Sequence, residues 1–259
     1  MMPSTAGDES PGLAALVEQP DFGARMLNIL SRLGDAEDTE CAVAQFRLAL
    51  DLIGADAGLF HSVIRDEATR RSHRSLLAGD PVWASEYARG NWHEHDPWLR
   101  HALHNAEPVR GSELDVRPDE ADFISVSSRL GFASSLIVPA PSPAGMSRVA
   151  VLALGSHRLG FFEHDGYPAL RVLARALAME LNRWLLRAIR QELLARSGIT
   201  PDEITLLRHE EAGHTSKMIG ATMHIEAKTI DCRFQRLNAK LDAPDRRTAA
   251  RIARLYGLL

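Results

Sequence analysis

The sequence predicts an α+β protein, with an N-terminal α/β/α sandwich built on an antiparallel sheet and a C-terminal all-α domain of four helices in a helix-turn-helix arrangement. Two observations indicate this division. Short strand-like runs mixed with amphipathic helical patterns occupy the first part of the chain. From Ile199 onward the patterns are those of short helices. The 259 residues suffice for two domains of modest size.

The composition is typical of an ordinary globular protein, with 45% hydrophobic and 25% charged residues. Cys41 and Cys232 are too few for a disulfide framework or a thiolate zinc site, which favours a reducing cytoplasm. The apolar runs fall far short of the ~20 residues that cross a bilayer. Residues 1–20 lack the basic start and apolar core of a secretory signal. We therefore expect a cytoplasmic protein with no membrane segment and a flexible tail over residues 1–20.

Two amphipathic patterns open the first predicted domain, which spans residues 21–190. They cover residues 21–34 and 39–54, and each ends at a glycine. Because glycine readily adopts the left-handed conformation that closes helices, Gly34 and Gly54 are predicted to end these two helices.

Four segments have the short apolar or alternating pattern of strands, which predicts the antiparallel sheet. They are residues 57–65, 74–78, 134–140 and 147–155.

A long helical pattern begins at Pro168 and ends at Ser197-Gly198, so a linker is predicted over residues 191–198. Its apolar stripe has three- and four-residue spacing, and consists of Leu170, Leu173, Leu177, Leu181, Trp184, Leu185 and Ile189. The stripe is expected to pack on the sheet of its own domain, with contact to a second copy as the alternative.

The second predicted domain, residues 199–259, begins with a capping box. Thr200 is placed as N-cap, Pro201 at the first helical position and Glu203 three residues after the cap. This helix is expected to stop at Gly213. Further helices are predicted over residues 216–222, 227–240 and 246–257. The short break before the third helix predicts a helix-turn-helix, whose third helix enters the major groove of DNA.

On the third helix, Ile230, Phe234 and Leu237 are predicted to be buried. The remaining faces carry cations expected to be free to meet phosphates, namely Lys228, Arg233, Arg236 and Lys240. Residues 199–259 hold 10 Lys and Arg against 8 Asp and Glu, whereas the rest of the chain holds 20 against 26. The basic surplus lies where DNA binding requires it. A solvated helical bundle that binds no nucleic acid is the alternative.

Residues 199–259 resemble the LuxR-type helix-turn-helix domain over their whole length and without gaps. The shared positions are Thr200-Pro201, Glu203, Gly213, Thr215-Ser216, Ile219, Ile225, Thr229-Ile230, Lys240-Leu241, Arg246 and Ala249. The resemblance implies that base edges are read by Asp231, Cys232 and Gln235. It implies contacts to the DNA backbone from Lys228, Thr229, Arg233 and Arg236.

Four positions depart from that family. Thr205 stands where a glutamate is usual, Glu226 where a small capping residue is usual, and Arg233 where histidine is frequent. Asp231 replaces a basic or amide side chain. Because a carboxylate accepts from the cytosine amino group and repels phosphate, Asp231 suits a specific reader better than a nonspecific one.

In the first domain, Trp83, Tyr87, Asp96 and Pro97 have the spacing W-x3-Y-x8-D-P, which is similar to the autoinducer-binding domain of LuxR-type quorum-sensing regulators. The similarity continues over residues 131–155. It implies an N-acyl homoserine lactone signal, with Trp83 donating to the lactone carbonyl, Tyr87 packing on the acyl chain and Asp96 accepting from the amide. A buried carboxylate needs a donor, so we expect Asp96 to be unpaired when no signal is bound.

Three small residues stand where this family often has larger or polar ones. Gly79 replaces a tyrosine, Gly111 a tryptophan and Ala153 a serine or threonine. We therefore expect a signal pocket that is roomier and poorer in polar contacts than is usual in the family.

Residues 93–104 also contain potential metal ligands, which raises a metal-dependent hydrolase as an alternative. These ligands are His93, His95, Asp96, His101 and His104. Because His93 and His95 are two residues apart, they point to different sides of a strand or helix. We therefore expect no catalytic site, no metal and no cofactor apart from the signal.

The sequence thus predicts a ligand-responsive transcriptional regulator that binds a DNA operator. A homodimer is expected, since one recognition helix reads too few base pairs. Thr205, Glu226 and Asp231 motivate the alternative of a signal-independent or antagonist protein of the same family that acts by heterodimerisation.

Overall fold

The computed structural model describes residues 11–65, 71–142 and 144–259. The chain divides into two compact units. The first unit extends to Asn182 but omits two short segments, and the second contains those segments together with Arg183–Leu259. Each unit has a hydrophobic core. Within the described segments, no helix is both long enough and apolar enough to cross a membrane.

The first unit is built on a five-stranded sheet with the order β2-β1-β5-β4-β3. The strands are β1 (Ala57–Arg65), β2 (Arg71–Ala78), β3 (Val109–Arg110), β4 (Ser134–Ala140) and β5 (Arg148–Ser156). β4 is antiparallel to both neighbours, with Leu136 opposite Leu154 and Ile137 opposite Val109. The antiparallel sheet is thereby confirmed, and β1 and β4 have the predicted bounds. The two-residue strand β3 is too short to show a pattern in the sequence.

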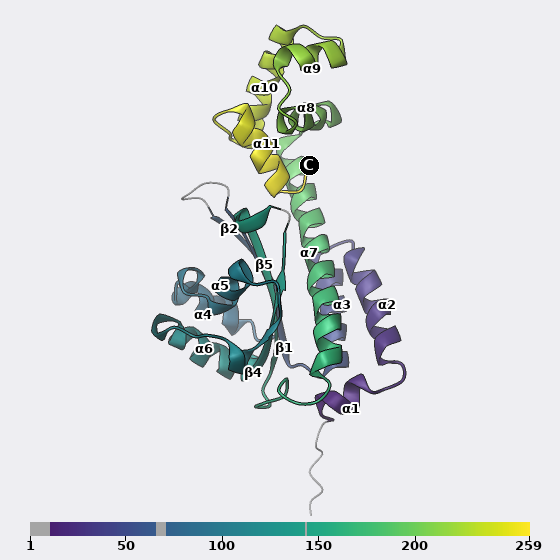
Figure 1. The fold of residues 1–259 in the computed structure, drawn as a ribbon, viewed down its shortest axis with the longest axis vertical. Coiled ribbons are helices and arrows are strands. Elements are labelled where there is room, and N and C mark those ends of the chain that lie inside the picture. The colour runs from purple at the N-terminus through teal and green to yellow at the C-terminus, as the bar shows by residue number, and fades with distance from the viewer. Residues whose placement is uncertain (1–10, 66–70, 143) are drawn as a thin grey trace, which may run out of the picture. The chain divides into compact units, whose positions relative to one another are not determined.

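Helices cover both faces of this sheet, which confirms the predicted α/β/α sandwich (Figure 1). On one side lie α4 (Val82–Arg89), α5 (Pro97–His104) and α6 (Ala121–Ser127). On the other lie α2 (Phe22–Gly34), α3 (Thr39–Ile53) and α7 (Tyr167–Ser197). Apolar and polar residues alternate along β1, but buried and exposed residues do not. Because helices cover both faces of the sheet, the residues of β1 are buried on both faces up to Ile64.

Short helical turns complete the connections between these elements. They are η1 (Trp92–Glu94), η2 (Gly111–Glu113), η3 (Pro118–Glu120), η4 (Ser128–Phe132) and η5 (Gly145–Ser147).

The predicted N-terminal tail needs correction. Residues 1–10 lie outside the described residues, but α1 (Leu13–Val17) forms a helical turn within the tail, and Leu13 is buried. The turn approaches Gly166, whose φ is 99° and whose added Cβ would lie 2.9 Å from the backbone nitrogen of Ala14. A contact across so many residues leaves no local pattern.

The two predicted glycine caps have different outcomes. Gly54 has φ 76° and closes α3, as predicted. Gly34 instead belongs to α2, and the helix ends at Asp35 with φ −107°. The backbone N–H of Asp35 donates to the carbonyl of Arg32, so a tight final turn ends the helix without a left-handed residue.

The long helix α7 contains the predicted apolar stripe. All its members are buried except Leu173, which is half-buried. The helix continues to Ser197 through most of the predicted linker, residues 191–198. Leu193 packs in the core of the second unit, beside Leu206 and Leu207.

The C-terminal helices follow the predicted order. They are α8 (Pro201–Glu211), α9 (Ser216–Met223), α10 (Ala227–Leu241) and α11 (Arg246–Leu255). The capping box is present, with the Thr200 hydroxyl accepting from the N–H of Glu203 and the Glu203 carboxylate accepting from the N–H of Thr200. Ile230, Phe234 and Leu237 are buried, as predicted.

The turn between α9 and α10 depends on two backbone features. His224 ends α9 in the left-handed conformation, with φ 57°. Gly220 packs directly beneath the turn, where a Cβ atom would overlap the carbonyl oxygen of Ile225. Glycine at this position therefore lets α10 begin close to α9.

Candidate functional sites

Aromatic side chains fill the space between the sheet and helices α4 to α6. Trp83 and Tyr87 are one turn apart on α4 and stack with ring centroids 4.8 Å apart. Trp98 lies parallel to Trp83, and Phe123 meets both indoles edge to face. Trp83 and Trp98 are buried. These contacts between the rings fix their orientations.

Asp96 is the buried carboxylate of this cluster. It is the N-cap of α5, and its Oδ1 accepts from the backbone N–H groups of Trp98 (2.8 Å) and Leu99 (3.0 Å). Its Oδ2 accepts from the hydroxyl of Tyr87 at 3.0 Å. The expectation that Asp96 is unpaired without a signal is therefore wrong, because the protein itself supplies three donors.

Burial is the largest influence on the pKa values of Asp96 and Tyr87. It raises the pKa of Asp96 to about 6, against the opposing effect of the Leu99, Tyr87 and Trp98 hydrogen bonds. Burial, followed by the charge of Asp96, raises the pKa of the Tyr87 phenol above its ordinary value. The pKa of the Asp96 carboxyl therefore lies well above its ordinary value of 3.8.

The indole N–H of Trp83 has a partner inside the protein. It points to the hydroxyl of Ser127 on α6, with Nε1 and Oγ 3.4 Å apart. This is a long hydrogen bond, which a better acceptor can replace. Trp83, Tyr87 and Asp96 are thus brought together as predicted, but each polar atom that the resemblance assigns to a ligand already has a protein partner.

A cavity of about 320 Å³ lies beside the aromatic cluster. Its apolar wall includes Trp98, Ile124, Phe132, Ala133 and Leu159. Its polar wall includes Ser112, Ser127, Ser128, Ser134, Ser135 and Glu163. The residues that line it do not include Trp83, Tyr87 or Asp96.

The three small residues behave differently from one another. Gly111 lines the cavity, and a Cβ atom there would overlap the hydroxyl oxygen of Ser135. Gly79 packs against Ala57, and Ala153 is fully buried in the core. Serine hydroxyls form much of the wall of this cavity. The expectation that the signal pocket is roomier and poorer in polar contacts than is usual in the family stays a prediction.

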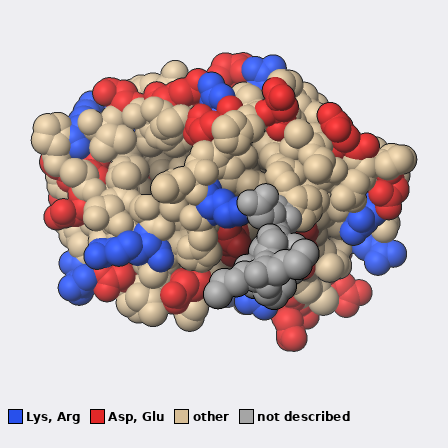
Figure 2. All heavy atoms as spheres, turned by 90° about the horizontal axis from the view of Figure 1, so that it is seen from below, with Lys and Arg blue, Asp and Glu red and all other residues tan. Residues whose placement is uncertain are grey.

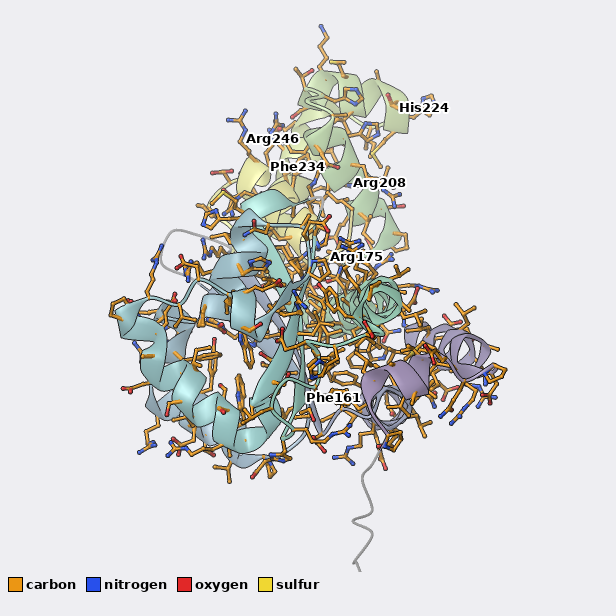
Figure 3. The ribbon with its side chains drawn as sticks, turned by 60° about the horizontal axis from the view of Figure 1, so that its bottom comes forward. Phe161, Arg175, Arg208, His224, Phe234 and Arg246 are labelled. Atoms are coloured by element: carbon orange, nitrogen blue, oxygen red, sulfur yellow. The ribbon has the colours of Figure 1, made fainter. Side chains whose placement is uncertain are left out.

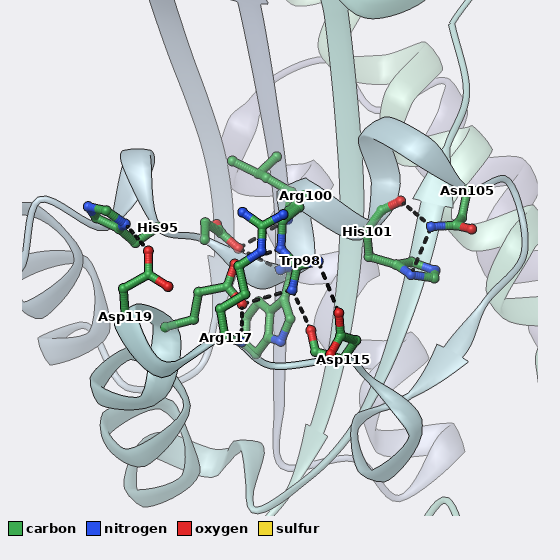
Figure 4. A network of polar contacts seen from close by, with 11 residues as sticks. His95, Trp98, Arg100, His101, Asn105, Asp115, Arg117 and Asp119 are labelled. Atoms are coloured by element: carbon green, nitrogen blue, oxygen red, sulfur yellow. Dashed lines mark hydrogen bonds and ion pairs between the residues drawn. The ribbon is translucent and has the colours of Figure 1, made fainter.

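A network of ion pairs holds the start of α5 in place (Figure 4). Arg100 binds both oxygens of the buried Glu120, at 2.6 and 2.8 Å. Glu120 also accepts from the backbone N–H of Arg117 at 2.9 Å. Since Arg100 follows Asp96 by one turn, this network fixes the cap that Asp96 forms.

The predicted metal ligands do not converge. His95 pairs with Asp119 at 2.9 Å, and His101 meets the carbonyl of Glu107. Asp96 is occupied as a helix cap. Across residues 11–65, 71–142 and 144–259, no three His, Cys, Asp or Glu side chains are grouped as a metal site.

His61 is a buried polar residue of this unit that the sequence reasoning missed. It lies on β1 with Nδ1 2.6 Å from the Ser75 hydroxyl and Nε2 3.4 Å from His73, and its ring faces Tyr87. Burial lowers its pKa to about 3, so it is neutral at neutral pH. A polar residue inside the apolar run of β1 was the available signal.

The predicted DNA-contacting residues lie on α10. Six are exposed, and Arg233 is half-buried; the exposed ones are Lys228, Thr229, Asp231, Cys232, Gln235 and Arg236. Lys240 is not free for phosphate, contrary to expectation, because its Nζ binds the Glu203 carboxylate at 2.7 and 2.8 Å. Lys240 lies near the C-terminal end of α10, where it closes the capping box of α8 instead.

Asp231 belongs to a polar chain that joins α9, α10 and α11. Its Oδ1 accepts from the Ser216 hydroxyl, which accepts from Arg246 Nη1 at 3.1 Å. Arg246 pairs with Glu210 at 2.9 Å and lies over the ring of Phe234 (Figure 3). One oxygen of the Asp231 carboxylate is therefore occupied within the domain.

The other departures have local consequences. The Thr205 hydroxyl donates to the carbonyl of Pro201 at 3.1 Å, within α8. Glu226 is the N-cap of α10 but makes no side-chain capping bond.

Charge is mixed on the face of the molecule shown in Figure 2. There, acidic and basic side chains of the described residues are interspersed. That face therefore presents no continuous basic surface to nucleic acid among the described residues.

Comparison with known proteins adds to this geometry. The family model described as "Autoinducer binding domain" matches residues 38–181, and "Bacterial regulatory proteins, luxR family" matches residues 197–253. No curated protein sequence matches the chain.

Several solved structures share the fold. The crystal structure of Escherichia coli SdiA is 18% identical, with a TM-score of 0.71 over 92% of this chain and 99% of that one. SdiA in complex with octanoyl-rac-glycerol is 17% identical, with a TM-score of 0.67 over 92% and 96%. CepR2 of Burkholderia cenocepacia, described as an N-acylhomoserine lactone dependent LuxR family factor, is 16% identical, with a TM-score of 0.55 over 63% and 95%.

Proposed function

Because the chain belongs to the LuxR-type regulators, in which an autoinducer-binding domain precedes a luxR-family helix-turn-helix, we propose that it is a transcriptional regulator that responds to an N-acyl homoserine lactone or a related acyl signal. It acts in the cytoplasm as a homodimer on a two-fold operator and catalyses no reaction.

The Trp83–Tyr87–Asp96 cluster carries the signal-sensing half of the proposal. Its three side chains share one buried site, where the Trp83 indole keeps only a long bond to Ser127. A ligand carbonyl replaces that bond at little cost, and the Asp96 carboxylate retains acceptor capacity beyond its three bonds. The aromatic rings supply apolar surface for an acyl chain.

The exposed face of α10 supports the DNA-binding half. Lys228 and Arg236 extend from it as donors for phosphate, while Gln235 offers an amide that recognises base edges. Two related structures set the ligand classes to be tested. One is SdiA in complex with octanoyl-rac-glycerol, and the other is CepR2, described as N-acylhomoserine lactone dependent.

Thermal unfolding with a ligand panel tests the signal. The panel contains homoserine lactones with short, long, oxidised and aromatic acyl groups, together with octanoylglycerol. At a hundred times its dissociation constant, a ligand that binds only the folded state stabilises it by about 2.7 kcal/mol, which raises the melting temperature measurably. We expect Trp83→Phe to remove the rise for the lactones while the protein stays folded. If no ligand shifts the curve and operator binding is equally strong without one, signal sensing is rejected.

The alternative function is that of a signal-independent or antagonist family member that acts by heterodimerisation. Two observations favour it, namely the unsupported N-cap Glu226 and the carboxylate Asp231 on α10. A gel shift at moderate salt with operators selected from a random pool separates the two functions. Specific retardation by the purified homodimer supports the regulator, and retardation only in the presence of a second LuxR-type protein supports the antagonist.

A further inference from the structure

We propose that Arg246 and Ser216 act as positioning residues for Asp231, and that they make its carboxylate read a cytosine in each half-site of the operator. The inference rests on the proposed function, since it assigns a base to the helix that is proposed to read DNA. It goes beyond that function because Arg246 lies on α11, outside the pair of helices α9 and α10 that forms the helix-turn-helix.

Asp231 lies where a recognition helix reads bases. It is the fifth residue of α10 (Ala227–Leu241), and its side chain is exposed. In helix-turn-helix proteins, the N-terminal residues of the second helix contact base edges in the major groove. An ionised carboxylate only accepts hydrogen bonds. At this position it therefore needs a base that presents a donor.

The hydrogen bonds behind Asp231 have a fixed direction. Because an arginine only donates, the contact of 3.1 Å between Arg246 Nη1 and Ser216 Oγ makes the serine the acceptor. The hydroxyl proton of Ser216 is then left for another partner, and Oδ1 of Asp231 accepts it. One oxygen of the carboxylate is thus held inside the domain, and Oδ2 is the oxygen that is left for DNA.

Three helices hold Arg246 in the position that this arrangement requires. Its Nε pairs with Glu210 of α8 at 2.9 Å, its Nη1 reaches Ser216 of α9, and its guanidinium carbon lies 5.5 Å from the ring centroid of Phe234 on α10 (Figure 3). The Glu210 side chain is only 13% exposed, so solvent screens this ion pair weakly. A guanidinium binds two partners through different nitrogens, whereas a lysine has a single nitrogen. The orientation of Ser216 therefore depends on arginine at position 246.

A single available oxygen favours cytosine among the four bases. In the major groove guanine presents two acceptors, and thymine presents an acceptor and a methyl group, so neither donates to Asp231. Adenine donates through N6, but its N7 acceptor lies beside that amino group and repels a carboxylate. Cytosine presents its N4 donor alone. A carboxylate held in one orientation therefore prefers cytosine, and one that rotates freely in solvent discriminates less.

Selection from a randomised duplex pool tests the inference on the full chain. We expect the wild type to prefer cytosine at one position of each half-site by about fivefold, the low end for a base contact. Asp231→Asn identifies this position, because an amide that both donates and accepts favours adenine there.

Arg246→Lys is the decisive variant, since it keeps the charge that pairs with Glu210 and loses the second donor nitrogen that reaches Ser216. It should remove most of the cytosine preference and leave the preferences at other positions as in the wild type. Arg254→Lys is the matched control, because Arg254 joins α11 to α8 through Glu211 instead. In the Ser216→Ala background, Arg246→Lys should not change the preference further, because both changes act through one hydroxyl.

A purely structural role of Arg246 predicts a different result. Arg246→Lys would then lower the melting temperature and weaken binding to every duplex alike, with the cytosine preference unchanged. If Arg246→Lys fails to fold by circular dichroism, Ser216→Ala takes its place, since it removes the hydroxyl and leaves the pair of Arg246 with Glu210 intact. It should likewise remove most of the cytosine preference.

The outcomes distinguish this inference from the proposed function. If the wild type selects no sequence from the pool, with or without the acyl ligands of the panel, DNA reading and this inference fall together. If it selects an operator whose bases Asp231→Asn leaves unchanged, only this inference is overturned. The same holds if the folded Arg246→Lys variant keeps the full cytosine preference, or if the position that depends on Asp231 is not a cytosine.

Discussion

The two units of this protein bury different kinds of side chain. The helices α8 to α11 enclose a core in which no described buried side chain is polar, and their ends are closed by Thr200, Thr215 and Asp245. The sandwich encloses aromatic rings together with buried polar groups, among them His61, Asp96 and Ser127. Of these two cores, only that of the sandwich contains buried groups whose protonation and partners can change.

This difference determines how strongly the stability of each unit depends on pH and on a ligand. A core of apolar side chains has a stability that depends little on pH or on a ligand. A buried carboxylate such as Asp96 costs free energy when it ionises, and a ligand with suitable donors recovers part of that cost. Under the proposed function, the sandwich is therefore the unit whose folding free energy a bound signal changes.

The largest expected effect comes from the apolar core. Phe234→Ala removes a buried ring beneath Arg246 and should lower the free energy of unfolding of the helix-turn-helix by about 3–5 kcal/mol. Arg236→Ala, two residues away and exposed, is the control and should change it by less than about 0.5 kcal/mol. Urea unfolding followed by circular dichroism measures both. Equal losses from the two variants would contradict the assignment of the core.

The next effect concerns Asp96 and pH. The pKa of this carboxyl is about 6 in the folded protein against 3.8 ordinarily, so the folded state holds the proton more tightly. Its contribution to stability is therefore fully present below about pH 4 and is lost as the pH rises through about 6, a change of roughly 3 kcal/mol. Asp96→Asn keeps an acceptor for the α5 cap and should flatten the stability of the sandwich across this window.

Tryptophan fluorescence follows mainly that unit, because three of the chain's four tryptophans, Trp83, Trp92 and Trp98, lie in its core, and only Trp184 belongs to the second unit. Unfolding at several pH values between about 4 and 7 covers the titration of Asp96. Asp80→Asn is the control, since Asp80 is an exposed aspartate with a local bond to the N–H of Val82. A variant Asp96→Asn with the same pH slope as the wild type would show that this carboxyl does not titrate as inferred.

The same contrast explains what the sequence could predict. The four C-terminal helices were predicted to within a few residues because their determinants are local: Thr200, Pro201 and Glu203 lie within four consecutive positions. The strands β1 and β4 were predicted for the same reason, by runs of suitable residues. Local patterns fix where elements begin and end.

The partners of the polar groups could not be predicted. Trp83 and Ser127 are 44 residues apart in the sequence. Gly111, in the turn η2, packs against the hydroxyl of Ser135 on strand β4. The resemblance brought Trp83, Tyr87 and Asp96 to one site, but it did not reveal that Tyr87 donates to Asp96. Such pairings follow from tertiary packing, which residue types alone do not specify.

A smaller effect tests the helix caps. Asp245 accepts from the N–H of Thr248, so Asp245→Ala should destabilise the helix-turn-helix by about 1 kcal/mol. Glu226 caps α10 without a side-chain bond, so Glu226→Ser should stabilise it by up to about 1 kcal/mol. Melting temperatures of the two variants measure these opposite shifts. A loss of stability in Glu226→Ser would show that Glu226 supports α10 in another way.

The smallest expected effect is on the affinity for DNA and concerns the surface of α10. It distinguishes a contact to a base edge from a contact to the DNA backbone. Asp231 has one oxygen held by Ser216, so the other alone can accept from a base amino group. Asp231→Asn should shift the preferred base at one position of each half-site by about 1 kcal/mol, the low end for a base contact. Ser216→Ala should relax the same preference, because it frees the carboxylate to rotate.

Arg236→Ala provides the contrasting result on the same helix. If Arg236 binds phosphate, its loss should weaken binding to every sequence alike and lower the dependence of log K on log salt by about one unit. Selection from a randomised duplex pool at two salt concentrations measures both quantities for all three variants. Wild-type preference in Asp231→Asn together with a wild-type salt slope in Arg236→Ala would remove α10 as the recognition helix, because neither base nor backbone would then depend on its exposed face.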